Sequence, residues 1–238
     1  MNSEIEKKLW KKAEKYVCIL RMVPFLRMVA VCNNLAFGKV DGNSDIDLFI
    51  IAKKGRLFIV RIFVTFLLHI LGVRRHGEKV AGRFCLSFFV DEDGMDMRKI
   101  AIDNDIYLAF WVRTMVPVVD DGVSEEFLRV NSWVRRNFEE DFEIDRSKVV
   151  ESGGILNRLF GWMLGGWFGN RVEAILKKWQ MRRAKEKMEV VDMEIASLIV
   201  EDHILKFHNV DRRREYRKKW FDKYGVEEKL DLEKFLGV

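Results

Sequence analysis

The sequence contains little proline and little cysteine. Its two prolines, Pro24 and Pro117, leave long segments of the 238 residues free to form uninterrupted helices. The three cysteines, Cys18, Cys32 and Cys85, are odd in number and form no CxxC pair, which excludes a zinc knuckle or dithiol redox motif of that type. Cysteine usage of this kind is typical of a reducing compartment, so we expect a cytoplasmic protein.

The sequence also lacks an apolar run that is long enough to cross a membrane. The run at 57–73 falls short of the roughly 20 apolar residues that a spanning helix needs, and it contains Arg61 and His69. The run at 155–168 is shorter still. Residues 1–16 are charged and amphipathic, without the apolar segment of a secretion signal. We therefore expect no membrane span and interpret both runs as buried helices.

The composition indicates a folded chain that can accept phosphate-bearing ligands. Hydrophobic residues make up 49% of the sequence, which is enough for one core and a smaller appended unit. The net charge is +5, far from the basic excess of a dedicated nucleic-acid coat protein. Charged residues, two serines and two glycines at 145–154 predict a boundary between a core domain at 1–145 and a C-terminal helical region at 146–238.

Local patterns predict a small sheet covered by helices. Short apolar, β-branched segments bounded by turn residues predict strands at 26–32, 45–52 and 83–90. Longer segments predict helices at 3–20, 56–71, 103–115, 124–138 and 170–188, with Ser124 as one N-cap, and mostly helix from 192 to 238. The expected fold class is therefore mixed α and β, with a small mixed β-sheet, helices packed on it, and the C-terminal helical region.

Two aspartates at the start of the second predicted strand are the most informative residues. Because alternate side chains of a strand leave on the same face, Asp45 and Asp47 should point together while Ile46 and Leu48 point into the core. Two neighbouring carboxylates repel each other unless a cation lies between them. Magnesium is the natural candidate, because it prefers one or two carboxylates together with the phosphates of a substrate.

The segment around these aspartates resembles the polymerase-beta-like nucleotidyltransferases. Their signature is a strand, a Gly-Ser turn, about ten further residues and then Asp-x-Asp on the next strand. Residues 44–50 (SDIDLFI) are similar to the second half of that signature, and the turn falls on Asn33 and Asn34, before a short helix start at 35–38. The resemblance extends over roughly the first 120 residues, because the next helix and third strand follow in the expected order.

The resemblance implies a set of site residues and ligands. Asp45 and Asp47 would be catalytic and would bind up to two Mg²⁺ ions, which align the attacking and leaving oxygens of a nucleoside triphosphate (NTP). Four residues would contact the nucleotide or shape its loop, namely Asn33, Asn34, Lys39 and Ser44. Asn33 replaces the glycine of the family, and Asn34 occupies the position of its phosphate-contacting serine.

The third carboxylate of the family, which helps to activate the acceptor hydroxyl, has no clear counterpart. On the third predicted strand, the face shared by Cys85, Ser87 and Phe89 leads only to Asp91, beyond the apolar run. Either Asp91 acts from the end of the strand, or Ser87 holds the position and no general base is present. Position favours Ser87.

The sequence therefore predicts an Mg²⁺-dependent enzyme that transfers a nucleoside monophosphate from an NTP to a hydroxyl of a small molecule, a protein or an RNA end. The alternative is a catalytically impaired module of the same fold that binds nucleotide, RNA or a protein partner. RNA contact would use the basic C-terminal helices, whose run at 211–219 (DRRREYRKK) has Tyr216 within it and Trp220 next to it. A third interpretation is peripheral membrane attachment through the Trp-rich and Gly-rich segment at 159–168.

Overall fold

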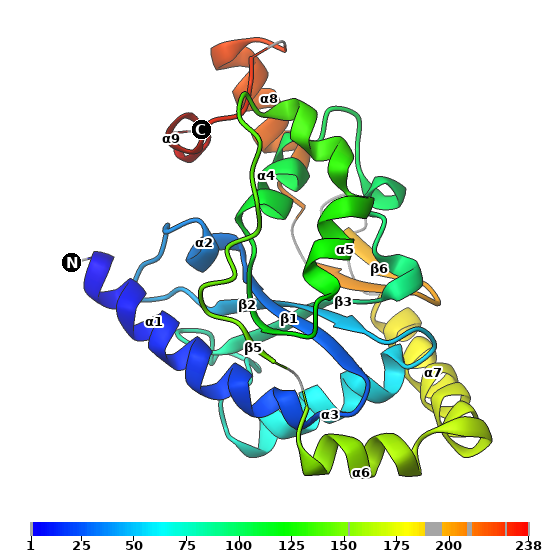
Figure 1. Cartoon of the computed structure of the whole chain (residues 1–238). Helices are drawn as coiled ribbons and strands as arrows, with labels where there is room; N and C mark the ends of the chain where they lie inside the picture. Colours follow the sequence, from blue (N-terminus) through cyan, green and yellow to red (C-terminus); the bar gives the residue numbers. More distant parts are fainter. Residues whose placement is uncertain (1, 152, 189–196, 209–210, 227, 238) are drawn as a thin grey trace.

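A seven-stranded mixed sheet forms the centre of the molecule (Figure 1). The computed structural model describes residues 2–151, 153–188, 197–208, 211–226 and 228–237. The strand order is β5-β4-β1-β2-β3-β7-β6, in which β2 pairs parallel with β3 and β4 with β5, while the other pairs are antiparallel. The strands are β1 (Leu26–Cys32), β2 (Ile46–Ala52), β3 (Phe84–Asp91), β4 (Val116–Asp120), β5 (Val150–Glu151), β6 (Ser197–Val200) and β7 (Ile204–His208).

Helices cover both faces of this sheet, and the sheet separates two hydrophobic cores (Figure 1). One core lies under α4, α5, α8 and α9, and the other lies under α1 and α3, with α7 packed against α3. The helices are α1 (Asn2–Val17), α2 (Asn33–Ala36), α3 (Leu57–Ile70), α4 (Ile106–Thr114), α5 (Val123–Val130), α6 (Ile155–Met163), α7 (Gly166–Met188), α8 (Arg213–Tyr224) and α9 (Leu232–Leu236). The expected mixed α and β class, with helices packed on a mixed sheet, is confirmed.

The central strands agree with the sequence pattern because their side chains alternate between the two cores. In β2, Phe49 and Ile51 enter the core under α4, whereas Leu48 and Ile50 enter the core under α3. Strand β1 matches its predicted bounds, β2 begins one residue later than predicted, and β3 begins and ends one residue later than predicted. The apolar run at 57–73 contains α3, whose inner side is buried as expected. The run at 155–168 was also expected to be a buried helix, and this is wrong, because no residue of that run is buried.

The C-terminal region differs from the expected helices, because it contributes strands to the sheet. The expectation of helix from 192 onward is wrong at β6 and β7, where β7 pairs with β3 through partners such as Phe89 and Leu205. The part of that expectation at 192–196 lies outside the described residues. The physical reason is the β-branched and apolar content of the two short strands around the turn before Ile204, which favours a hairpin. The domain boundary at 145 stays a prediction, although the sheet includes strands from both sides of it.

Two smaller expectations are also corrected. Strand β4 was not predicted, because Pro117 lies inside it. The pairing of β4 with β1 shifts register between Pro117, opposite Ala30, and Val119, opposite Val29. The helix expected at 124–138 ends at Val130 and continues as a 3₁₀ helix, and Ser124 does not cap it. The Ser124 hydroxyl instead donates a hydrogen bond to the buried Asp120 carboxylate at 2.6 Å.

The glycine-rich segment forms the junction between α6 and α7, where Gly166 has a φ of 57°. Among the helices that the structure describes, none combines the length and apolar character needed to cross a bilayer.

Gly94 tests how the C-terminal hairpin docks on the sheet. A Cβ atom at this position would lie 2.2 Å from the His203 carbonyl oxygen, which itself accepts a hydrogen bond from the Asp91 amide. We expect Gly94→Ala to lower the free energy of unfolding by about 2 kcal/mol or more, measured by urea denaturation. Gly161→Ala is the control, because no atom outside its chain neighbours and its own helix backbone lies within 4 Å of the Cβ position. Equal stability of Gly94→Ala and the wild type would contradict this packing.

Candidate functional site

Asp45 and Asp47 project from the same face at the beginning of β2. Ile46 and Leu48 are fully buried in the core on the opposite face, so the alternation expected from the sequence is present. The carboxylate oxygens of the two aspartates and the Cys85 sulfur all lie within 4.8 Å of one another. Two acidic side chains and a thiol therefore converge on one small space.

The bend after β1 lies beside this pair. Asn33 begins α2 with a φ of 57°, the left-handed conformation that glycine adopts most easily and that asparagine tolerates. Its side chain hydrogen-bonds the Asp47 carboxylate and accepts a hydrogen bond from the Tyr107 hydroxyl at 3.3 Å. The Asn33 side chain thus connects α4 to the acidic pair.

A cation that the sequence analysis did not identify balances part of the charge. Arg75 Nη1 lies 2.7 Å from Asp45 Oδ2, and the two side chains are 42% and 16% exposed. Burial, the largest single effect, lowers the pKa of the Arg75 guanidinium, but the charge of Asp45, the neighbouring Cys85 and the hydrogen bonds to both together outweigh it, so the pKa is raised. Arg75 comes from the loop before β3, where no sequence pattern marks its approach to Asp45.

The surroundings of Asp47 raise the pKa of its carboxyl group. Burial, followed by the charge of Asp45, raises the pKa of the Asp47 carboxyl to about 6. The hydrogen bond from Asn33 and the charge of Arg75 act in the opposite direction without cancelling this increase. A cation bound between the aspartates would relieve the same repulsion.

The residue opposite Asp47 on β3 is Cys85, rather than the expected Ser87. Asp47 pairs with Cys85, and the next pair is Phe49 with Phe88, so β3 contains one extra residue between them. Ser87 is buried within this irregularity. Burial and then the Asp47 charge raise the pKa of the Cys85 thiol to about 12, so it is protonated at neutral pH. The irregularity also turns Phe89 into the opposite core, which breaks the alternation that was expected to continue through Asp91.

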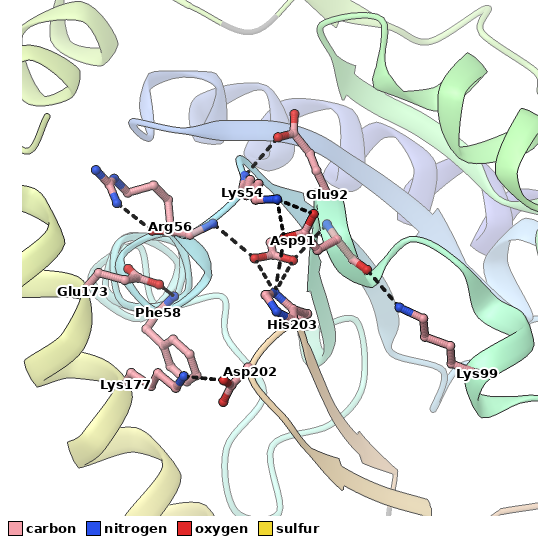
Figure 2. A network of polar contacts seen from close by, with 12 residues as sticks. Lys54, Arg56, Phe58, Asp91, Glu92, Lys99, Glu173, Lys177, Asp202 and His203 are labelled. Carbon is pink, nitrogen blue, oxygen red and sulfur yellow. Dashed lines mark hydrogen bonds and ion pairs between the residues drawn. The ribbon is translucent and has the colours of Figure 1, made fainter. Parts of the chain in front are cut away.

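Asp91 lies at the other end of the sheet, contrary to the alternative that it assists the aspartate pair. It pairs with Ala52, five residues along β2 from Asp47, which corresponds to roughly 17 Å. Its buried carboxylate accepts hydrogen bonds from the Gly55 and Asp93 amides and lies 3.0 Å from His203 Nδ1 (Figure 2). These contacts join the loop after β2, the end of β3 and the start of β7.

The Asp91 end of the sheet borders a cavity of about 690 Å³. Its walls include Lys54, Arg56 and Lys177, but Lys54 is paired with Asp93 and Lys177 with Asp202 at 2.7 Å. Asp91, Asp93 and His203 are also close enough to hold an ion. The buried Asp91 carboxylate is already bound by two backbone amides and by the His203 side chain. We therefore assign this network a structural role.

The remaining predicted nucleotide contacts have different surroundings. The Ser44 hydroxyl donates to Asp41 Oδ1 and accepts from the Asp41 amide, both at 2.9 Å, so it closes the loop that leads into Asp45. Asn34 is exposed on α2. Lys39 Nζ donates to the Leu236 carbonyl oxygen at 2.9 Å, which directs it toward the end of α9 rather than into the acidic pair.

The basic run at 211–219 is used partly for folding. Arg213 is only 11% exposed and forms ion pairs with Asp211 and Asp105. Trp220 is fully buried, and Tyr216 stacks on Phe235. The aromatic residues of this region are therefore packing residues and do not offer free faces for bases.

Comparison with known proteins adds no family to this geometry. No protein-family description, no curated protein sequence and no solved structure matches the chain. The likeness to polymerase-beta-like nucleotidyltransferases therefore depends on the residues and positions given above.

The raised pKa of Asp47 predicts a specific pH dependence of stability. A carboxyl with a pKa near 6 in the folded state and about 3.9 in the unfolded state holds more protons when folded, so its contribution to stability falls as pH rises from 4 to 6. We expect Asp47→Asn to gain stability relative to the wild type over this range, in urea unfolding without divalent cations. A stability difference that is the same at pH 4.5 and pH 7.5 would contradict the shift.

Proposed function

We propose that the chain binds a nucleoside triphosphate together with Mg²⁺ at the start of β2 and transfers the nucleoside monophosphate to a hydroxyl of an acceptor. The observation that carries this proposal is the meeting of Asp45 and Asp47 beside the left-handed bend at Asn33. The proposal is supported by the resemblance to the polymerase-beta-like nucleotidyltransferases, in which this bend would correspond to the phosphate-contacting turn. The strands on either side of the bend are adjacent and antiparallel.

The donor set fits one magnesium ion. Asp45 and Asp47 supply carboxylate oxygens, the ligands that Mg²⁺ prefers, and substrate phosphates and water would complete its shell. When bound, the ion would supply charge stabilisation to the phosphates undergoing transfer. The protonated thiol of Cys85 is a poor ligand for a hard cation, so the second ion of the family lacks a complete set of protein ligands.

The protein groups beside the proposed ion would have different roles in binding. Arg75, already 2.7 Å from Asp45, would contact triphosphate oxygens, since a guanidinium forms directional hydrogen bonds with phosphate. Asn33 and Tyr107 hold the orientation of Asp47. In the transfer, the acceptor oxygen forms a bond to the α-phosphorus, the bond to the pyrophosphate leaving group breaks, and the acceptor proton passes to water.

Cys85 favours a second candidate function, a nucleotide-binding module with little turnover. The position beside the aspartate pair holds a neutral thiol, which cannot take the acceptor proton as a carboxylate would. A protein partner then fits better than RNA as the second ligand, because Arg213 and the nearby aromatic residues are engaged in the fold. A cytoplasmic location belongs to both proposals and is supported by the three free cysteines.

Calorimetric titration tests the nucleotide site. We expect NTP with Mg²⁺ to bind the wild type and the double variant Asp45→Asn/Asp47→Asn to lose at least about tenfold in affinity, since the ion loses both charged ligands. Asp93→Asn is the matched control, because it removes a carboxylate from the other acidic cluster and should leave affinity unchanged. Unchanged binding by the double variant would rule out the proposed site.

Cys85→Asp separates the two candidate functions. The substitution places a third carboxylate opposite Asp47, and we expect it to raise the rate of Mg²⁺-dependent pyrophosphate release by about tenfold or more if the thiol limits turnover. Cys85→Asn is the control, with similar size and no charge. Release by the wild type that neither substitution changes would show that a third carboxylate is not limiting.

A further inference from the structure

Helix α6 exposes its apolar side to solvent. Its exposed apolar residues follow the spacing i, i+1, i+4, i+7 and i+8, which puts them within about 120° of one another around the axis. They are Ile155, Leu156, Leu159, Trp162 and Met163. Ile155 is 86% and Trp162 82% exposed, although Trp162 is among the largest apolar side chains of the chain. An amphipathic helix of a globular protein normally buries this side.

The opposite side of α6 attaches it to the body of the protein. Asn157 Nδ2 donates to the Val23 carbonyl oxygen at 2.7 Å, and the Phe160 ring packs against Phe63 of α3 with a centroid distance of 5.5 Å. The contacts fix which side faces outward. The fold therefore keeps the apolar stripe of α6 exposed to solvent.

Helix α7 continues this exposed surface. Trp167, Phe168, Ile175 and Trp179 are all exposed, with Trp167 at 71%. The inner side of α7 is held by Glu173, whose two carboxylate oxygens accept hydrogen bonds from the Phe58 and Ile59 amides of α3 at 2.9 Å each. In Figure 1, α6 lies at the lower edge of the molecule and α7 runs along its lower right side.

Basic residues surround these apolar side chains. Segment 155–188 contains eight Lys or Arg residues and two acidic residues, a net charge of +6, so the rest of the chain sums to −1 within the total of +5. One of the two acids, Glu173, is buried against α3. Arg171 lies 5.1 Å from the centre of the Trp167 ring, and Arg183 lies 5.4 Å from that of Trp179. The segment that carries the exposed aromatic residues of α6 and α7 therefore has a net positive charge, whereas the rest of the chain is close to neutral.

We infer that α6 and α7 dock on the surface of an anionic lipid bilayer, with the apolar stripe inserted among the headgroups and acyl chain ends. Exposed Trp, Phe and Leu flanked by Lys and Arg are typical of helices that lie in the plane of a membrane interface. Helix α6, about 14 Å long, would lie along the surface. The docking surface, formed by the exposed residues of α6 and α7, is separate from the aspartate pair and does not depend on the proposed nucleotide chemistry.

Charge and residue type favour lipid over other occupants. A second copy seated symmetrically on the same surface would bring two segments of charge +6 together, which is unfavourable. Lysine is depleted in protein interfaces, whereas the docking surface is flanked by Lys178 and Lys185. RNA would use the aromatic rings but would gain nothing from an aliphatic stripe such as Ile155, Leu156 and Leu159.

Vesicle sedimentation of the full chain tests the inference. We expect binding to vesicles of phosphatidylcholine with phosphatidylglycerol, much weaker binding to phosphatidylcholine alone, and a blue shift of tryptophan fluorescence on binding. Trp162→Glu/Trp167→Glu should lower the partition coefficient by about tenfold or more. Lys178→Glu/Arg182→Glu should lower it on anionic vesicles only. Val226→Glu, an exposed apolar position in the loop after α8, should leave binding unchanged.

Three outcomes would overturn the inference. The first is absence of binding to anionic vesicles by wild-type protein with a cooperative thermal transition. The second is a concentration-dependent dimer that the Trp substitutions abolish, which would assign the surface to a second copy. The third is binding to single-stranded RNA that the same substitutions abolish while vesicle binding persists. Because all substituted side chains are exposed, a matching melting temperature for each variant ensures that loss of binding does not report unfolding.

Discussion

The repulsion between Asp45 and Asp47 organises one end of this protein. Two carboxylates on one face of a strand, partly withdrawn from water, raise the free energy of the folded state unless other groups compensate. Arg75 pairs with Asp45, Asn33 hydrogen-bonds Asp47, and Tyr107 holds Asn33 in place. These contacts do not remove the cost, because the pKa of Asp47 still lies near 6. This remaining cost supports the proposal that the two aspartates bind a cation together with its ligand.

The opposite end of the sheet uses acidic residues differently. Asp91 has a similar local setting, a carboxylate at a strand end near a second aspartate, but the Gly55 and Asp93 amides and His203 surround it. These partners stabilise the Asp91 carboxylate, and its contact with His203 holds the start of β7 against the end of β3. The two ends show that acidic clusters alone do not identify a site, and that the partners of each carboxylate distinguish the two roles. The docking surface on α6 and α7 is a third region, and it would bring a membrane to the side of the molecule that carries α3.

The sequence predicted the central strands because their pattern reflects local physics. Strands β1, β2 and β3 are apolar and bounded by turn residues, so both their positions and the shared face of Asp45 and Asp47 could be read from the period of two. The irregularity in β3 could not be predicted from the sequence, because an extra residue between Cys85 and Phe88 does not change the pattern of an apolar run. That residue decides which side chain faces Asp47. Arg75 was missed because a tertiary contact, its ion pair with Asp45, places it at the site. The β6–β7 hairpin was missed although the β-branched and apolar content of its two short strands favours strands.

The central claim is that Asp45 and Asp47 share a divalent cation. Anomalous X-ray diffraction from crystals of the protein grown with Mn²⁺ and a non-hydrolysable nucleoside triphosphate tests it most directly. We expect an anomalous peak at about 2.0–2.2 Å from a carboxylate oxygen of each aspartate, with the triphosphate on the same ion. A peak at Asp91, Asp93 and His203 with none at the aspartate pair, or nucleotide bound elsewhere while Arg75 remains on Asp45, would contradict it.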